Sequence, residues 1–421
     1  MKNLFDVRHK SHHNVGGLLK KYYPTTMKGE NDLIEILKNK SDVPKAIYMH
    51  TPYCDKICSF CNLNREQLKG SLEEYSDFIV SEFDKYGQYA YFKDGTFDVV
   101  YFGGGTPTVY KADQLEKILQ SVQRNVNFSE GYEFTLETTI HNLTNEKIEL
   151  LNKYGVNRIS IGIQSFTERG REFYNRTYDT NTTIENIKNI KNRFNGEVCV
   201  DIIYNYPDQK IEDVLFDAKT IKELDLGSSS FYSLMIHEGS KLSQDVHNNI
   251  LTMKDNLEKE RALHDAFVNE LTKEKDYYVL ELTKIAKKGR DQYKYIKTRN
   301  FGGDTFPIGS GAGGNVGNIS IFRMGKDRSM YVEKTPYQQK LERVGGLFQF
   351  PSIERDIISS LLTDKEISIF NKRIGEYVEM GLIKIENKTL ELTDLGLFWG
   401  NNIARDIIET LIDESNKVIN K

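Results

Sequence analysis

Hydrophobic positions along the chain follow two alternating patterns. Short runs rich in Val, Ile, Phe and Tyr, typical of buried strands, are followed by longer segments in which apolar residues recur every three or four positions, as on one face of a helix. The strand-like runs lie at 46–50, 98–102, 133–137, 158–163, 199–204 and 230–235, and the helical segments at 72–86, 112–124, 145–154, 183–193 and 211–224. Six strand-helix units in series predict an α/β fold with a parallel, barrel-like sheet.

The strand-like runs are almost wholly apolar. The run ISIGI within 158–163 does not alternate strictly between polar and apolar residues, which is typical of parallel strands that helices cover. We therefore assign residues 46–300 to one barrel domain, with a long helix at 255–273 near its end. Barrels of this kind commonly form one unit of about 250 residues.

The segments on either side of the barrel have other patterns. Residues 1–45 form a polar, Lys-rich stretch with His12 and His13, and we expect an N-terminal arm that caps the barrel or moves. Residues 301–421 form the predicted C-terminal domain. It begins with the glycine-rich stretch FGGDTFPIGSGAGGNVGN, which cannot be an ordinary helix.

The end of the chain predicts a small winged-helix-like module. Helical patterns at 353–361 and 364–380 lead into GLIKIENKTLELTDLGLFWG, which indicates a two-stranded wing followed by a final helix to residue 412. Such a module can bind DNA, so a DNA-binding redox regulator is one alternative function. Acidic side chains offset Lys and Arg in 364–400, whereas a DNA-binding face has a basic excess. We therefore expect no nucleic-acid partner.

Composition is that of an ordinary soluble globular protein. The 421 residues are 38% hydrophobic and 28% charged, with a formal net charge of −4. No stretch approaches the ~18 consecutive apolar residues that a membrane span needs, and the first residues lack the apolar core of a secretory signal. We expect no membrane span and a cytoplasmic location.

Three of the four cysteines, Cys54, Cys58 and Cys61, fall within eight residues directly after the first predicted strand. Three thiolates at CxxxCxxC spacing can bind three corners of a [4Fe-4S] cluster and leave one iron open. The alternative is a zinc site with His50 as a fourth ligand. Cys199 stands alone in the apolar run 198–203, and we assign it to core packing.

Four segments carry a family resemblance: IYMHTPYC, YFGGGTPT, LLNKYGVNRISIGIQSF and VDIIYNYPDQ. With the cysteine array they resemble the radical S-adenosylmethionine (SAM) superfamily. Within it they are most similar to the subgroup of oxygen-independent coproporphyrinogen III oxidases, heme chaperones and anaerobic heme-degrading methyltransferases (anaerobilin synthases). The resemblance implies a partial (β/α)6 TIM-like barrel, a [4Fe-4S] cluster, one or two SAM molecules and a low-potential electron donor such as a flavodoxin or ferredoxin.

The resemblance also implies roles for individual residues. The glycine turn, whose bare backbone lets a ligand approach, would hold the methionine part of SAM, and four further side chains would contact its ribose and carboxylate. Two aromatic side chains would pack on the cluster and the adenine. In that order the residues are Gly103, Gly104, Gly105 and Thr106; Glu137, Gln164, Arg176 and Asp201; and Tyr48 and Phe60. Read without the resemblance, Glu137 and Asp201 could cap the sheet and Arg176 could form a surface ion pair.

Departures from two branches of the subgroup favour the third. The oxidases have another Cys two residues beyond the array, where this chain has Asn62-Leu63. The heme chaperones have an Arg-His pair and a His-Asn motif, where this chain has Arg176-Thr-Tyr178 and Gln292-Tyr-Lys-Tyr295. We therefore expect a heme-degrading enzyme that methylates and opens the porphyrin and releases iron. A heme chaperone and an oxygen-independent coproporphyrinogen III dehydrogenase are the alternatives.

A heme substrate needs a large apolar surface and a few polar contacts. The 24 Tyr and 22 Phe residues suit it. His12, His13 or His237 are candidates for contact with the iron, although a lone histidine is more often an ordinary surface or core residue. The glycine run 309–314 is expected either to line the cavity or a second SAM site or to serve as a flexible linker. No catalytic residue is assigned.

Overall fold

The computed structural model describes residues 5–11, 13–23, 25–61, 66–67, 72–253 and 256–419, with the side chains of 13–14, 66–67 and 415–419 excepted. His12, the side chain of His13, and Asn62 and Leu63 thus lie outside the described residues. Within this part of the chain, every helix is too short or too polar to cross a membrane.

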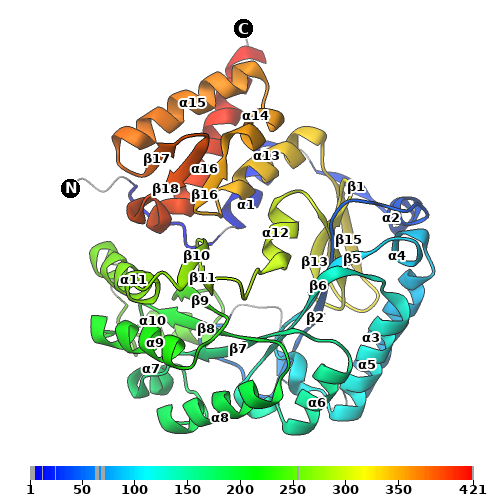
Figure 1. The fold of residues 1–421 in the computed structure, drawn as a ribbon. Coiled ribbons are helices and arrows are strands. Elements are labelled where there is room, and N and C mark those ends of the chain that lie inside the picture. The colour runs from blue at the N-terminus through cyan, green and yellow to red at the C-terminus, as the bar shows by residue number, and fades with distance from the viewer. Residues whose placement is uncertain are drawn as a thin grey trace.

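The six predicted strands form parallel neighbours in one curved sheet, so the predicted α/β fold is confirmed (Figure 1). They are β2 (Lys45–Thr51), β5 (Phe97–Gly104), β6 (Phe128–Thr138), β7 (Arg158–Gln164), β8 (Glu197–Tyr204) and β9 (Ser228–Ser233). The helices on the convex face are α3 (Glu73–Gly87), α5 (Ala112–Asn125), α6 (Asn145–Lys153), α8 (Thr180–Arg193), α9 (Ile211–Glu223) and α11 (Leu257–Thr272).

Alternate residues of each strand face either the helices or the concave side of the sheet. In β8, Val198, Val200 and Ile202 belong to the main hydrophobic core together with residues of α9, while Asp201 lines a cavity on the other side. Burial of the apolar side against helices fixes which side faces inward, because a shift of one residue would exchange the two sets. The strand pattern therefore positions polar side chains inside the barrel.

Further strands extend this sheet at both edges, in the order β1-β15-β14-β13-β12-β2-β5-β6-β7-β8-β9-β11-β10. β12 pairs parallel with β2, and β11 pairs antiparallel with β9. The sequence did not predict these added strands, which are β1 (Thr26–Lys28), β10 (Tyr277–Glu281), β11 (Lys284–Lys287), β12 (Asp304–Ile308), β13 (Gly313–Val316), β14 (Ile319–Arg323) and β15 (Ser329–Glu333).

The glycine-rich stretch is a structured part of the large sheet, neither a linker nor part of the cavity lining. It forms β12, a turn and β13. Gly309 has φ +88°, and a Cβ there would lie 2.5 Å from the His50 carbonyl oxygen; a Cβ at Gly314 would lie 2.1 Å from the Thr305 carbonyl oxygen. The glycines thus allow close backbone contact between strands. The predicted domain boundary at residue 300 falls just before strands that continue the barrel sheet.

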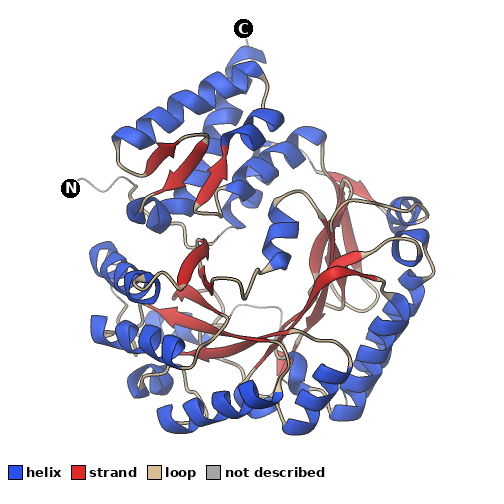
Figure 2. Cartoon of the chain, viewed as in Figure 1, coloured by secondary structure: helices blue, strands red, loops and turns tan. Residues whose placement is uncertain are grey.

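The C-terminal module has its own hydrophobic core. It contains a sheet in the order β16-β18-β17, so a third strand joins the two-stranded wing that the sequence predicts, and the last helix reaches Ile419 instead of 412. Its elements are α14 (Arg355–Leu361), α15 (Asp364–Glu379), α16 (Asp394–Ile419), β16 (Ser352–Glu354), β17 (Ile383–Glu386) and β18 (Thr389–Leu392). Figure 2 shows this module against the open side of the curved sheet.

The N-terminal arm contributes to both hydrophobic cores, and its residues Leu33 and Leu37 belong to the main one. Helix α1 (His13–Tyr22) contributes Val15, Leu18 and Leu19 to the core of the C-terminal module, and β1 pairs with β15 of the large sheet. The described residues of the arm therefore pack against the rest of the protein, and the alternative of a mobile arm does not apply to them.

Candidate active site

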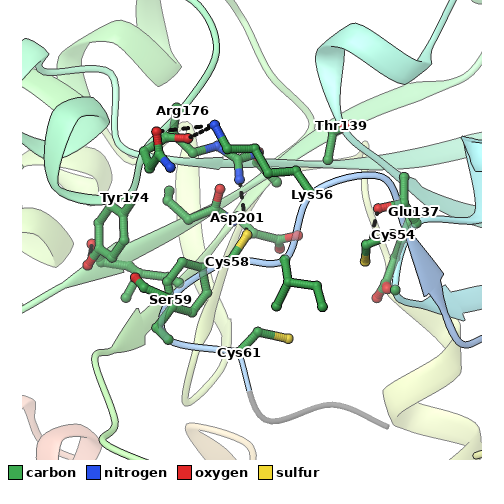
Figure 3. Close-up of a pocket in the computed structure, with 18 of the residues that line it drawn as sticks. Cys54, Lys56, Cys58, Ser59, Cys61, Glu137, Thr139, Tyr174, Arg176 and Asp201 are labelled. Carbon is green, nitrogen blue, oxygen red and sulfur yellow. Dashed lines mark hydrogen bonds between the residues drawn. The ribbon is translucent and has the colours of Figure 1, made fainter. Parts of the chain in front are cut away.

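A cavity of about 780 Å³ opens near the carboxyl ends of the parallel strands (Figure 3). Eleven of the thirteen predicted site residues line it, from six different segments of the chain. They are Cys54, Cys58, Phe60, Cys61, Gly104, Gly105, Thr106, Glu137, Gln164, Arg176 and Asp201. Tyr48 and Gly103 are not among the lining residues. Sites at this end of a strand-helix barrel are the rule, because the loops there converge from several strands.

The cysteine loop is fastened to the neighbouring glycine turn. Cys54 lies in the short strand β3 (Tyr53–Cys54). Thr106 donates a backbone hydrogen bond of 2.9 Å to the Tyr53 carbonyl oxygen, and its hydroxyl lies 3.6 Å from Cys54 Sγ. At the other side of the loop, Arg176 Nη1 lies 3.5 Å from Cys58 Sγ (Figure 3). These contacts order a loop that has little secondary structure of its own.

The three cysteines are free thiols that face one cavity. Across the described residues, no three His, Cys, Asp or Glu side chains are close enough to bind one metal ion. A zinc ion requires such convergence, whereas the corners of a cubane cluster accept thiolates that stand apart around it. Burial raises the pKa of the Cys54 thiol to about 11, and metal coordination would deprotonate it. The donor set therefore fits a [4Fe-4S] cluster.

The glycine turn at the end of β5 has no room for side chains. Gly104 has φ +114°, and a Cβ on it would lie 2.7 Å from the Thr51 carbonyl oxygen. A Cβ on Gly105 would lie 2.5 Å from the Tyr53 carbonyl oxygen and 2.9 Å from Cys54 Sγ. Glycine is thus required here because backbone and cysteine loop touch.

Glu137, at the end of β6, is the most perturbed acid of the predicted set. Its carboxylate accepts hydrogen bonds from the Tyr101 hydroxyl at 2.6 Å and from the Gly104 backbone at 3.2 Å. Burial raises its pKa to about 7, the negative charge of Asp201 adds to the rise, and the two hydrogen bonds oppose it. A raised pKa in a cavity is typical of a functional carboxyl group.

Gln164, Arg176 and Asp201 place further polar groups in the cavity, and one of these groups is unpaired. Gln164 adopts φ +64°, and its Oε1 has no hydrogen-bond partner among the described residues. Arg176 Nη2 donates to the Gly162 carbonyl oxygen at 2.6 Å, and Asp201 accepts from Ser160 at 3.3 Å. A buried orphan oxygen on a strained residue is costly unless a ligand completes it. These side chains therefore suit the polar groups of a molecule such as SAM.

Tyr48 and Gly103 lie behind the residues that line the cavity and contact them. Tyr48 stacks on Tyr101 and Tyr295, each with a centroid separation of 6.0 Å, and its hydroxyl lies 3.0 Å from His50 Nδ1. A Cβ on Gly103 would lie 2.9 Å from Glu137 Oε2. The structure thus places Tyr48 in an aromatic stack next to the lining residues, and its packing on the cluster and the adenine stays a prediction.

An apolar wall closes another side of the cavity. Phe60 and Tyr174 meet edge to face with centroids 5.2 Å apart, and Leu242 and Leu251 pack in the same cluster. Leu242 also donates a 2.9 Å backbone hydrogen bond to the Ser59 carbonyl oxygen, which ties helix α10 (Lys241–His247) to the cysteine loop. This wall provides contact for a large apolar ligand.

Sequence reasoning missed the polar wall formed by Ser230, Tyr232, Lys284 and Tyr293. Only Ser230 and Tyr232 lie in a predicted strand, and Lys284 belongs to β11, which was not predicted from the sequence. The remaining candidates lie elsewhere: His50, His237 and Cys199 do not line the cavity. Cys199 is fully buried, as core packing predicts.

Comparison with known proteins agrees with this geometry. The family model described as "Radical SAM superfamily" matches residues 48–221. The coproporphyrinogen III oxidase of Escherichia coli, a radical SAM enzyme, superposes with a TM-score of 0.75 at 18% identity over 94% of this chain and 98% of that one, which shows a common fold. The chain therefore carries a radical SAM domain.

Two curated relatives narrow the class. A heme chaperone of Lactococcus lactis is 24% identical over 389 residues, 89% of this chain and 99% of that protein. An anaerobilin synthase of Escherichia coli O157:H7 is 22% identical over 379 residues, 87% of this chain and 84% of that protein. The chain is thus similar over most of its length to the subgroup of radical SAM proteins that contains these relatives, as its motifs predict.

Proposed function

We propose that this protein is a radical SAM enzyme that acts on a tetrapyrrole, and that its reaction is anaerobic heme degradation, with methylation from SAM, opening of the porphyrin ring and release of iron. The observation that carries the proposal is the cavity itself. Free thiols at CxxxCxxC spacing and an apolar aromatic wall face the same space of about 780 Å³. That volume lies in the upper part of the range of about 300–1,000 Å³ for small-molecule sites.

The residues have distinct proposed roles. Cys54, Cys58 and Cys61 hold the cluster, which together with SAM supplies the electron transfer and radical chemistry. Glu137 and Asp201 orient the ribose of SAM through their carboxylates, and the Gly104 backbone leaves room for its methionine part. Reduced protein requires a low-potential flavodoxin or ferredoxin, and we place the reaction in the cytoplasm.

The apolar wall has a separate proposed role. Phe60, Tyr174 and Leu251 offer apolar contact area for a flat macrocycle and exclude water from the space beside the cysteines. Exposed Ile57 and Ile250 belong to the same lining, and they extend the apolar contact towards solvent. Burial of apolar surface favours binding of the ring by about 25 cal/mol per Å².

The relatives support the substrate class but differ in activity. Two of them are named for heme or for its degradation product, and a third for coproporphyrinogen. Asn62-Leu63 in place of a further cysteine favours heme degradation over the oxidase reaction. A heme chaperone is the second candidate, because the Lactococcus lactis relative aligns over 99% of its own length.

The deciding experiment is anaerobic turnover. Protein reconstituted with iron and sulfide is given reductant, SAM and heme, or coproporphyrinogen III in a parallel reaction, while the Soret band is followed and products are analysed by mass spectrometry. A methylated, open tetrapyrrole supports heme degradation. Heme that stays bound and unchanged contradicts it and supports the chaperone, whereas decarboxylation of coproporphyrinogen supports the oxidase.

Cluster variants provide the control. Ala at Cys54, Cys58 or Cys61 is expected to abolish the absorbance of the cluster and reduce SAM cleavage to background, while Cys199→Ala, which alters a thiol outside the cavity, is expected to keep the cluster. A cluster that survives the triple replacement would refute the assignment of these ligands. Salt-dependent DNA binding without SAM cleavage would favour a regulator instead.

A further inference from the structure

Lys284 is a buried cation on the wall of the cavity. Its exposed fraction is 2%, yet no described residue accepts a hydrogen bond from its ammonium group or lies within ion-pair distance of it. The ammonium group lies 4.5 Å from the centre of the Tyr293 ring. Its Nζ is not among the enclosed side-chain atoms that lack a hydrogen-bond partner, so the ammonium group reaches the open space of the cavity. An anionic ligand there could accept a charge-assisted hydrogen bond from it.

The strand register places the side chain of Lys284 on the same face of the sheet as the side chains of its neighbours. Lys284 pairs with Ser230 across β11 and β9, and Ser230 pairs with Asp201 across β9 and β8. Side chains paired in this way lie on one face of a sheet, and all three line the cavity. Lys284 is therefore part of the inner surface of the barrel.

Ser230 supplies a second unused polar group beside it. Its side chain is 1% exposed, and its Oγ has no hydrogen-bond partner among the described residues. An ammonium group and a hydroxyl group can each donate to one oxygen of a carboxylate. The ammonium group of Lys284 and the hydroxyl group of Ser230, on adjacent strands, therefore match the two oxygens of such a ligand, with the Tyr232 hydroxyl beside Ser230.

The nearby acids are already engaged. Asp291 accepts two hydrogen bonds from Arg158, at 3.0 and 2.9 Å, and Glu281 accepts from both the backbone and the hydroxyl of Thr283. Neither forms an ion pair with Lys284, although the charge of Lys284 favours the ionised form of both acids from a greater distance. The charge of Lys284 thus remains available to a ligand in the cavity.

We propose that Lys284 and Ser230 form a carboxylate-binding subsite that anchors an acidic side chain of the substrate. This inference rests on the proposed function, since it takes a tetrapyrrole with carboxylate side chains as the ligand. The methionine carboxylate of SAM is the other carboxylate that this subsite could bind. Five strands separate β2, which leads into the cysteine loop, from β11 in the sheet, and this order favours the substrate.

The test compares heme with its dimethyl ester, which keeps the ring and iron but lacks the carboxylates. Soret titrations under anaerobic conditions use the full-length, cluster-loaded protein. Wild-type protein is expected to bind heme about 10- to 100-fold more tightly than the ester, the size of effect for hydrogen bonds to charged groups. Lys284→Met is expected to lose that preference by weakening heme binding, and Ser230→Ala to reduce it by a smaller factor.

Lys287→Met is the matched control. Lys287 lies on the same strand, is ion-paired with Asp225 and does not line the cavity, so this variant should bind both ligands as the wild type does. Thermal unfolding of each variant establishes that it is folded, and Ser230→Ala carries the test if Lys284→Met does not fold.

Each other outcome has a definite meaning. Equal affinity of wild-type protein for heme and ester, or an unchanged preference in Lys284→Met, overturns the subsite while the proposed function stands. A Lys284→Met protein that loses affinity for SAM and keeps its heme preference assigns the carboxylate to SAM and overturns the substrate anchor. Wild-type protein that binds neither tetrapyrrole overturns the proposed function, and the anchor with it.

Discussion

The Tyr101 hydroxyl donates a 2.6 Å hydrogen bond to Glu137 Oε1, which joins the strand bearing the glycine turn to the next strand of the barrel. Tyr101 in turn stacks on Tyr295, with ring centroids 4.5 Å apart. These contacts hold the Glu137 side chain in position on the side away from the cavity, and its other side faces the cavity. The site is rigid at this point before any ligand binds.

Glu137 should make stability depend on pH. Burial raises its folded pKa from 4.5 to about 7, so its stabilising contribution is complete below pH 4.5 and is lost as pH rises through 7. Relative to Glu137→Gln, the cluster-free wild type should lose about 2–3 kcal/mol of unfolding free energy between pH 4.5 and 8. Denaturant unfolding of both proteins across this range measures it; parallel pH profiles would contradict it.

Gly105→Ala should impair cluster binding. The added methyl group would meet the Tyr53 carbonyl oxygen and Cys54 Sγ, and overpacking of this kind costs about 1–3 kcal/mol, which corresponds to roughly 5- to 150-fold in cluster retention. Iron and sulfide content after reconstitution is the measurement. Gly375→Ala is the control: nothing lies within 4 Å of that position in α15, and we expect a gain of about 0.5–1 kcal/mol. Full cluster loading in Gly105→Ala would refute the prediction.

Asp291→Asn should destabilise the barrel. Burial disfavours the charge of Asp291, but Arg158 outweighs it and holds the pKa of Asp291 well below its usual range. Stability from this pair is thus present above pH 3.8 and lost in acid. Removal of the negative charge leaves Arg158 buried and unpaired, at a cost of about 3–5 kcal/mol in denaturant unfolding.

The control for Asp291 is an exposed pair. Lys388 and Asp356 lie 3.1 Å apart with side chains 82% and 72% exposed, and Asp356→Asn should change the unfolding free energy by about 0–1 kcal/mol. Equal effects of the two Asn substitutions would show that the buried pair has no special role.

Arg8→Met should loosen the contact between the arm, the barrel and the C-terminal module. Arg8 forms an ion pair with Glu260 and donates to the Phe398 carbonyl oxygen at 2.9 Å and to the Tyr204 hydroxyl at 3.0 Å. The substitution leaves buried Glu260 with the ion pair to Lys10 at 3.3 Å and the hydrogen bond from Ser233 at 2.8 Å, and we expect a loss of about 3 kcal/mol.

Limited proteolysis and denaturant unfolding would measure that loss. Lys10→Met is the comparison, since Lys10 is the more exposed and more distant partner of Glu260, and its effect should be the smaller. If Arg8→Met unfolds like the wild type, the arm does not stabilise the packing of the C-terminal module against the barrel.

The sequence predicted the parallel strands and the lining of the cavity near the cysteines because these signals are local. β7 is continuous and apolar and was located to within one residue of its end. The positions that follow Cys54 and those around Gly104 are separated by short, fixed spacings, which define a motif without knowledge of the whole fold. The stacking of Tyr48 on Tyr295, nearly 250 residues away in the chain, could not be predicted from such local signals.

The glycine run 309–314 shows the opposite case. Glycine indicates only that bulk is excluded or that φ is unusual, and a linker, a cavity wall and a tight hairpin share that signal. Contact with the His50 and Thr305 backbones selects the hairpin, and those contacts arise only once β12 has paired with β2.

By itself the sequence determined the radical SAM domain, its three cysteines, its glycine turn and the series of strands and helices, because each depends on residues close together in the chain. Only the tertiary structure decided that Lys284 faces the same cavity, that Arg8 bridges the arm to Glu260 and that the glycine run extends the sheet. These relationships depend on pairing and burial between distant segments, and the position of Lys284 on the cavity wall becomes apparent only when all its neighbours are in place.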